Sequence, residues 1–245
     1  MGMSSIDAIH DFAFAAEPAV TFRALDLRPE QPKAAAVFPA QTSTELMLRA
    51  LDVLLSLLLL IFLLPPLLSI YLAIWLNGDG PVLFGQQRIG MGGRSFRCLK
   101  FRTMVTDAER RLQELLASDA DARAEWARDQ KLRADPRITS VGRFLRRTSL
   151  DELPQIFNVL KGEMSLVGPR PIVSAEIARY GRYFAEYKTV RPGVSGLWQI
   201  SGRNDVSYRR RVALDVFYAR RRSLSLYIGV VARTPGRVLL STGCY

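Results

Sequence analysis

The chain has 245 residues and a formal net charge of +11, and the excess of basic residues, most of them arginines, lies beyond residue 76. This length suits one domain of ordinary size, with room for an anchor or a tail, and the arginines suit phosphate-bearing partners such as nucleic acid, nucleotides or anionic lipid headgroups. Because the two cysteines are not clustered and the single His10 lies in a polar N-terminal segment, imidazole catalysis and His or Cys metal sites are nearly excluded, which leaves carboxylate, Ser, Lys, Arg and oxygen-ligated Mg²⁺ chemistry.

The N-terminal segment and the apolar run that follows it have different compositions. Residues 1–45 are rich in alanine, proline and small polar residues without a sustained period, which predicts a disordered or weakly ordered tail. The run from Val53 to Leu76 has 24 uncharged residues, enough for a helix that crosses a bilayer. Pro65 and Pro66 at its centre remove two amide donors and disrupt the preceding turn. The run therefore predicts either a simple span or a re-entrant helix that returns to the same face.

The next segments predict a hairpin and helices. Residues 82–103 have the pattern of a β-hairpin with a glycine-rich turn, and because no helix follows the glycines, a turn is favoured over a dinucleotide phosphate loop. Residues 106–132 have a helical pattern. Residues 208–240 carry two arginine triplets around apolar side chains. Beside a membrane segment they predict an interfacial amphipathic helix whose arginines meet anionic headgroups, with a solvated face as the alternative.

The densest group of chemically active residues lies between positions 135 and 171. Asp151 and Glu152 are expected at the start of a helix that ends at Gly162, with Pro154 in its first turn. There the helix dipole is positive and exposed amides attract phosphate. Ser149 and Glu152 also match a capping box, which is the ordinary structural interpretation of this pattern.

The arginines around this acidic pair favour a chemical role. Arg143, Arg146 and Arg147 precede it, and the Gly-Pro-Arg-Pro sequence at 168–171 forms a stiff turn that could hold Arg170 at a fixed angle. Carboxylates surrounded by arginine are expected to keep low pKa values, so that one can act as a nucleophile and the other as a metal ligand.

Six short blocks carry a family resemblance. They are KFRTM at 100–104, DPR at 135–137, LDELPQ at 150–155, GEMSLVGPRP at 162–171, RPG at 191–193 and SGRN at 201–204. With these blocks in this order, the chain from about residue 46 onward resembles the bacterial sugar transferases, small monotopic phosphoglycosyl transferases that begin exopolysaccharide and glycan assembly.

The resemblance implies an α+β, mainly helical monotopic membrane protein with a small β-hairpin and interfacial amphipathic helices. Residues 46–78 would form a re-entrant membrane helix broken at Pro65 and Pro66. Residues 79–245 would form a catalytic domain on the cytoplasmic face of the bacterial inner membrane.

The resemblance also implies a reaction and its partners. Asp151 would attack the sugar-bearing phosphorus of a UDP-sugar and pass the phospho-sugar to undecaprenyl phosphate, with Glu152 as the Mg²⁺ ligand. The run at 196–208 looks closest to succinoglycan-type priming enzymes, which implies galactose-1-phosphate transfer, with glucose-1-phosphate as the alternative. Downstream glycosyltransferases are expected partners and nucleic acid is not. The rival interpretation is a non-enzymatic, membrane-anchored phosphate-binding or scaffold protein. The residues expected to contact the substrates are Lys100, Arg102, Arg146, Pro169, Arg170, Pro171 and Arg203.

Overall fold

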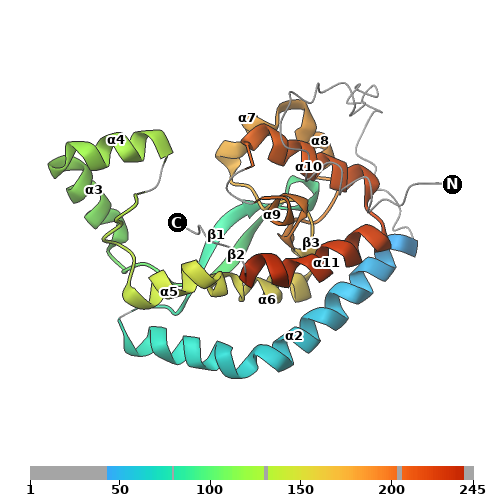
Figure 1. Ribbon diagram of the computed structural model, residues 1–245, viewed down its shortest axis with the longest axis horizontal. Helices are drawn as coiled ribbons and strands as arrows, with labels where there is room; N and C mark the ends of the chain where they lie inside the picture. The colour runs from blue at the N-terminus through green and yellow to red at the C-terminus, as the bar shows by residue number, and fades with distance from the viewer. Residues whose placement is uncertain (1–42, 79, 130–131, 203–205, 240–245) are drawn as a thin grey trace.

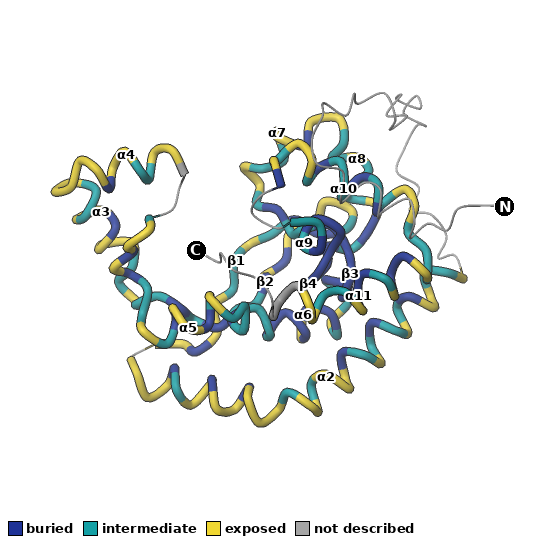
Figure 2. Tube along the Cα trace, viewed as in Figure 1, coloured by how far each residue is buried: buried dark blue, intermediate teal, exposed yellow. Residues whose placement is uncertain are grey.

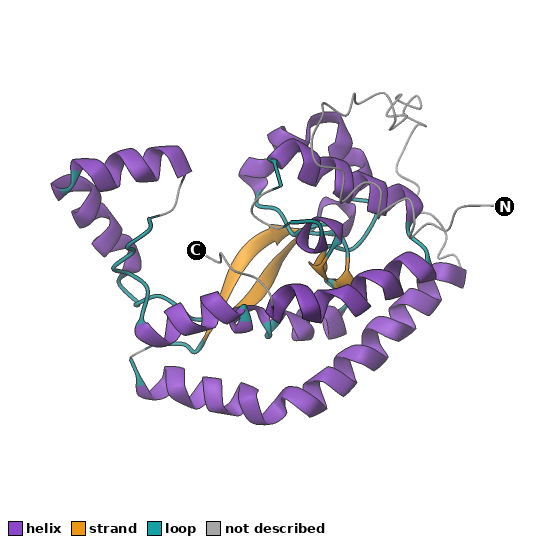
Figure 3. Ribbon diagram, viewed as in Figure 1, coloured by secondary structure: helices purple, strands orange, loops and turns teal. Residues whose placement is uncertain are grey.

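The computed structural model describes residues 43–78, 80–129, 132–202 and 206–239. The described part is mainly helical and includes a small antiparallel hairpin (Figure 3), which confirms the predicted fold class at this level. The expected N-terminal tail lies outside the described residues up to position 42, and its last three residues already belong to the first described helix.

The described elements have the following bounds in chain order: α2 Ser43–Leu76, β1 Leu83–Ile89, η1 Met91–Gly93, β2 Ser95–Phe101, α3 Ala108–Ser118, α4 Ala120–Asp129, α5 Ser140–Thr148, η2 Leu150–Glu152, α6 Gln155–Lys161, β3 Ser165–Val167, η3 Ser174–Glu176, α7 Ile177–Tyr180, η4 Gly181–Tyr183, α8 Phe184–Tyr187, β4 Gly193–Ser195, α9 Leu197–Ile200, α10 Tyr208–Arg221 and α11 Leu224–Leu239. The first two strands pair antiparallel and β3 pairs with β4 in parallel.

The apolar run forms α2, a single helix that contains Pro65 and Pro66. Figure 1 shows α2 as a bent arc along one side of the molecule. The expected interruption at the two prolines is thus a bend in a continuous helix. The two prolines leave carbonyls one turn earlier without their usual amide donors. The Ser69 hydroxyl does not replace those donors, because it donates to the Pro65 carbonyl at 3.0 Å.

Both halves of α2 pack against the rest of the domain. In the first half, Leu48 joins a core cluster that includes Val159 of α6 and Tyr227 of α11. In the second half, Ile74 joins a different cluster with Leu145 of α5. Because both halves bury side chains on the same domain, α2 lies along that domain and does not extend away from it.

Polar side chains fix the first half of α2. Arg49 donates at 2.6 and 2.9 Å to two carbonyls in the last turn of α6, where a helix carries partial negative charge. The Asp52 carboxylate accepts from the Ser165 hydroxyl, the Leu166 amide and the Tyr227 hydroxyl, at 2.8 to 3.0 Å. These contacts tie the start of α2 to α6, β3 and α11.

The outer side of α2 is apolar and exposed (Figure 2). Only 17% of its most apolar stretch is buried inside the molecule, which distinguishes it from the core helix of a soluble protein. By length and composition it can cross a membrane. The most exposed large side chains on it are Phe62, Ile61, Leu76, Trp75 and Leu68.

The predicted hairpin is confirmed. Leu83 pairs with Phe101 and Ile89 with Ser95. Gly92 in the connecting turn has a positive φ of 70°, which glycine adopts without steric cost. This register places Lys100 near the end of β2, the strand that contacts the short turn η2.

Two helix predictions need correction. The helix expected over 106–132 is interrupted at Asp119, which ends α3 and whose side chain accepts from the Asp121 and Ala122 amides at the start of α4. This local cap competes with helix continuation. Figure 1 shows α3 and α4 projecting from the rest of the domain.

The single helix expected over 208–240 is two helices, α10 and α11. The break follows the second arginine triplet. Arg220 lies 2.6 Å from the Glu186 carboxylate and Arg222 pairs with Glu45 at the start of α2. Two arginines of this triplet are therefore neutralised by carboxylates of the protein itself.

Candidate active site

The acidic pair lies in a tight turn and not in the first turn of an α-helix. Helix α5 ends at Thr148, and the next residue, Ser149, adopts a left-handed conformation (φ 58°) and donates its amide to the Arg146 carbonyl at 3.2 Å. The turn η2 then holds Asp151 and Glu152, and α6 begins three residues later and ends at Gly162 as expected. The prediction that Ser149 and Glu152 form a capping box was wrong. A residue that follows a helix in the left-handed conformation does not have the extended backbone of an N-cap.

Lys100 joins the two carboxylates. Its ammonium donates to Glu152 Oε1 at 2.6 Å and lies 3.7 Å from Asp151 Oδ2. The two side chains differ in environment, since 12% of the Asp151 side chain is exposed and 42% of the Glu152 side chain is. The structure thus gives neighbouring carboxylates different surroundings, as required for different tasks.

Burial raises the pKa of Asp151 above its ordinary value, against the opposing effect of the Lys100 ammonium, while Glu152 raises it further and Arg146 lowers it. The expectation that the arginines hold both carboxyl pKa values low was wrong for Asp151. Desolvation of the charged form outweighs the neighbouring cations.

Of the three arginines upstream, Arg146 faces the site, whereas Arg143 and Arg147 are exposed. The Arg146 Nε donates to the Thr103 hydroxyl at 2.9 Å, and the guanidinium acts electrostatically on Asp151. Helix α5 approaches the backbone of Thr103 closely, because a Cβ on Gly142 would lie 2.0 Å from the Thr103 carbonyl oxygen. A small residue at this position therefore brings Arg146 to the carboxylate.

The Pro169-Arg170-Pro171 loop lies next to the hairpin. The Pro171 carbonyl accepts from Arg88 of β1 at 2.9 Å, and the Pro169 carbonyl accepts from the Gly193 amide at 2.8 Å. Arg88 and Arg170 act electrostatically on each other, and Arg88 also interacts with Glu152. The loop is thus connected to the acidic pair through Arg88, which the sequence interpretation missed.

Of the expected substrate residues, Arg102 has its described contact away from this centre. Arg102 donates to the Gly78 carbonyl at 3.1 Å, just after α2, so the described contact places it at the helix exit. Arg203 lies outside the described residues.

Asp215 is another buried carboxyl, which the sequence interpretation missed. It is 1% exposed, and the Tyr180 hydroxyl donates to it at 2.7 Å. Burial raises the pKa of Asp215 to about 7. An acidic residue between Leu214 and Val216, within the apolar set of the helix, was the available signal that this carboxyl is buried.

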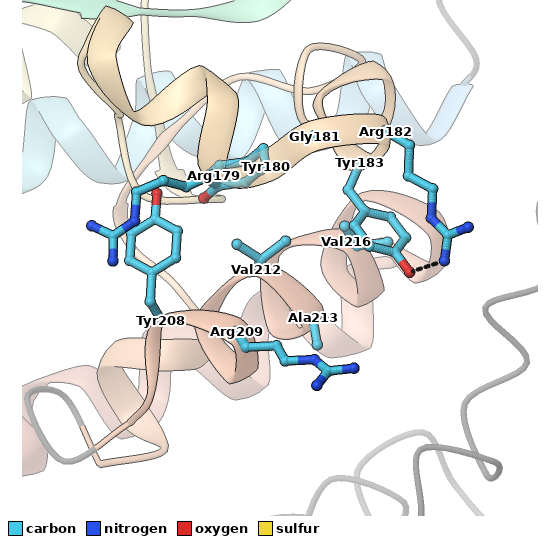
Figure 4. Close-up of a pocket in the computed structure, with 10 residues that line it drawn as sticks. All are labelled: Arg179, Tyr180, Gly181, Arg182, Tyr183, Tyr208, Arg209, Val212, Ala213 and Val216. Carbon is cyan, nitrogen blue, oxygen red and sulfur yellow. Dashed lines mark hydrogen bonds between the residues drawn. The ribbon is translucent and has the colours of Figure 1, made fainter.

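A cavity of about 730 Å³ lies between the α7–η4 segment and α10, apart from the acidic pair (Figure 4). Figure 4 shows Arg179 with Tyr208 at one end and Arg182 with Tyr183 at the other. The cavity is basic and aromatic at its ends and apolar at its floor.

The acidic pair offers oxygen ligands of the kind that Mg²⁺ prefers. No group of three or more His, Cys, Asp or Glu side chains that could hold a metal ion occurs among the described residues. Mg²⁺ at phosphate sites is commonly held by one or two carboxylates together with substrate oxygens and water. Asp151 and Glu152 are adjacent carboxylates, so they fit an ion shared between the protein and a phosphate ligand.

This chemistry defines a class: a carboxylate and cation site suited to phosphate groups, in a helical domain with an apolar anchor helix. The profile of the family described as "Bacterial sugar transferase" matches residues 43–241. The chain belongs to this family.

Individual relatives support the same assignment. The undecaprenyl-phosphate galactose phosphotransferase of Salmonella typhimurium is 48% identical over 206 residues, 84% of this chain and 43% of that protein. Exopolysaccharide production protein ExoY of Rhizobium meliloti is 46% identical over 80% of this chain and 87% of its own length. The UDP-glucose:undecaprenyl-phosphate glucose-1-phosphate transferase of Caulobacter vibrioides is 39% identical over 90% and 78%. The chain spans less than half of the length of several curated relatives, the Salmonella protein among them.

Proposed function

We propose that this chain transfers a hexose-1-phosphate from a UDP-sugar to undecaprenyl phosphate, as a membrane step of exopolysaccharide synthesis. The observation that carries the proposal is the contact of Lys100 with both Asp151 and Glu152. Relatives named as undecaprenyl-phosphate sugar phosphotransferases support the choice of substrates.

The proposed reaction has two displacements at one phosphorus atom. The Asp151 carboxylate forms a bond to the sugar-bearing phosphorus, the bond to the bridging oxygen breaks, and UMP leaves with the electron pair. A phosphate oxygen of undecaprenyl phosphate then attacks the same phosphorus and restores the free carboxylate. Lys100 and Arg146 offset the negative charge around Asp151, which lets two anions approach each other.

Mg²⁺ is part of the proposal. Glu152, with Asp151 beside it, would hold the ion together with donor phosphate oxygens. When bound, Mg²⁺ would neutralise charge on the phosphates. The protein itself positions the carboxylate through η2 and shields it from water by burial. The Pro169-Arg170-Pro171 loop would bind the nucleotide-sugar donor from the other side of Arg88.

The anchor helix is proposed to enter one leaflet and return. Support comes from the bend of α2 and from the packing of both its halves on one domain, which a straight span could not achieve. The catalytic domain would then lie on the cytoplasmic face of the inner membrane.

Cysteine labelling tests this topology. Ser43→Cys and Gly78→Cys, each in a background with Cys244→Ser, are expected to react with a membrane-impermeant maleimide in inside-out vesicles and not in intact spheroplasts. The native Cys98 is buried and serves as the unlabelled control. Labelling of the two introduced cysteines from opposite sides would mean that α2 is a simple span.

Galactose-1-phosphate is the proposed cargo, with glucose-1-phosphate as the alternative, because relatives carry both names. The two hexoses differ in the orientation of one hydroxyl, so one or two hydrogen bonds decide between them. We expect purified protein with Mg²⁺ and undecaprenyl phosphate to release UMP from UDP-galactose faster than from UDP-glucose. Faster release from UDP-glucose would refute the choice of sugar, and release from no UDP-sugar would refute the proposed function.

A further inference from the structure

Two guanidinium groups meet on one indole ring beside the proposed donor loop. The Arg211 guanidinium, from α10, lies 4.2 Å from the centre of the Trp198 ring, and that of Arg170 lies 5.6 Å from it. Each of the three residues comes from a different segment, so the fold and not local sequence brings them together. Arg211 also lies 5.7 Å from the Tyr208 ring.

Several donors in this cluster lack partners. The Nε atoms of Arg170 and Arg211, the indole nitrogen of Trp198 and the hydroxyl of Tyr208 are buried and have no hydrogen-bond partner among the described residues. Buried donors are usually paired, and leaving them unpaired destabilises a protein. A ligand that presents oxygen acceptors would satisfy these donors.

The charge of the cluster indicates an anion. Burial lowers the pKa of Arg211, and the neighbouring Arg170 lowers it further. The nearby Asp215 accepts from the Tyr180 hydroxyl and acts electrostatically on both arginines, but it forms no ion pair with either of them among the described contacts. Two like charges held together are therefore available to an anionic ligand.

The cluster is connected electrostatically to the reaction centre. Cys98 of β2 is influenced electrostatically by Lys100, Arg88, Glu152 and Arg170, so these groups form one continuous neighbourhood. Helix α9 packs in the same core cluster as the start of α2, whereas Figure 1 shows α10 along the edge of the molecule opposite the bent middle of α2. A polyprenyl acceptor would approach from the α2 side, which leaves this cluster to the water-soluble donor.

The combination of guanidinium donors and aromatic faces fits a phosphate that carries a planar base. The Arg179 guanidinium stacks on the Tyr208 ring at 3.6 Å, and both residues line the cavity of Figure 4. We propose that Arg211, together with Arg170 and Trp198, binds the nucleoside monophosphate half of the donor, the part that leaves as UMP. This inference rests on the proposed function and adds a residue outside the six family-like blocks.

The test is direct binding of UMP to the full-length protein in detergent or nanodiscs, without acceptor. We expect Arg211→Ala to weaken UMP binding by about 10-fold or more, because it removes a charge-assisted contact, and to raise the donor KM more than it lowers kcat. Arg221→Ala, an exposed arginine at the end of the same helix, is the matched control and should bind UMP like the wild type.

A second variant keeps the test decisive. If Arg211→Ala lowers the melting temperature of the protein, Arg211→Lys is tested in its place. Lysine keeps the charge but lacks the planar donor group of arginine, so weaker UMP binding is again expected. Wild-type UMP affinity in either folded variant overturns the inference even if donor turnover is normal. UMP binding that depends on Arg211 without turnover of any UDP-sugar would instead overturn the proposed function alone.

Discussion

Asp151→Asn is expected to reduce transfer of hexose-1-phosphate by at least about 1000-fold, because an amide cannot act as the attacking oxyanion. The substitution keeps the size of the side chain, so the melting temperature should change little. Transfer is measured as lipid-linked hexose formed from a radiolabelled UDP-sugar. Asp121→Asn, at an exposed acidic residue on α4, is the matched control and should retain wild-type activity.

Glu152→Gln is the informative comparison. If Glu152 holds Mg²⁺, its amide variant should need a higher Mg²⁺ concentration for half-maximal rate, whereas Asp151→Asn should be inactive at every concentration. Substantial turnover by Asp151→Asn would show that another residue is the nucleophile.

Gly193→Ala is expected to have the second large effect, on the fold around the donor loop. A Cβ at this position would lie 2.0 Å from the Gly168 amide nitrogen and 2.3 Å from the Ser195 carbonyl oxygen. Both atoms belong to the backbone and cannot rotate away, so we expect a loss of more than about 3 kcal/mol in the free energy of unfolding. Thermal and denaturant unfolding measure this loss.

Gly236→Ala provides the control for this substitution. Nothing lies within 4 Å of the Cβ that it would add, and the residue belongs to α11. Alanine favours a helix over glycine, so its stability should be equal or slightly higher. A Gly193→Ala variant as stable as the wild type would mean that β3 and β4 can separate without cost.

Local patterns predicted those elements whose shape depends on a few adjacent residues. The hairpin followed from alternating side chains around glycines, and the end of α6 at Gly162 followed from the left-handed conformation that glycine favours. The length and apolar character of α2 were equally visible in the sequence. These properties belong to the segment itself and require no knowledge of its neighbours.

Properties that depend on tertiary contacts were harder to predict. Ser149 matched a capping box, but its left-handed backbone ends α5, and this puts Asp151 into a separate turn. The raised pKa of Asp151 follows from burial beneath the surrounding elements, whereas the sequence showed only the adjacent arginines. Arg211 was grouped with a surface triplet, but the fold places it on Trp198.

The central claim is that Asp151 carries the phospho-sugar between donor and acceptor. The most direct measurement is intact-protein mass spectrometry after incubation with Mg²⁺ and UDP-galactose but no undecaprenyl phosphate, followed by peptide mapping. The account predicts an increase in mass of one hexose phosphate, located at Asp151, absent from Asp151→Asn and discharged when undecaprenyl phosphate is added. A hexose phosphate mapped to another residue, or efficient transfer without any trapped adduct under these conditions, would contradict the account.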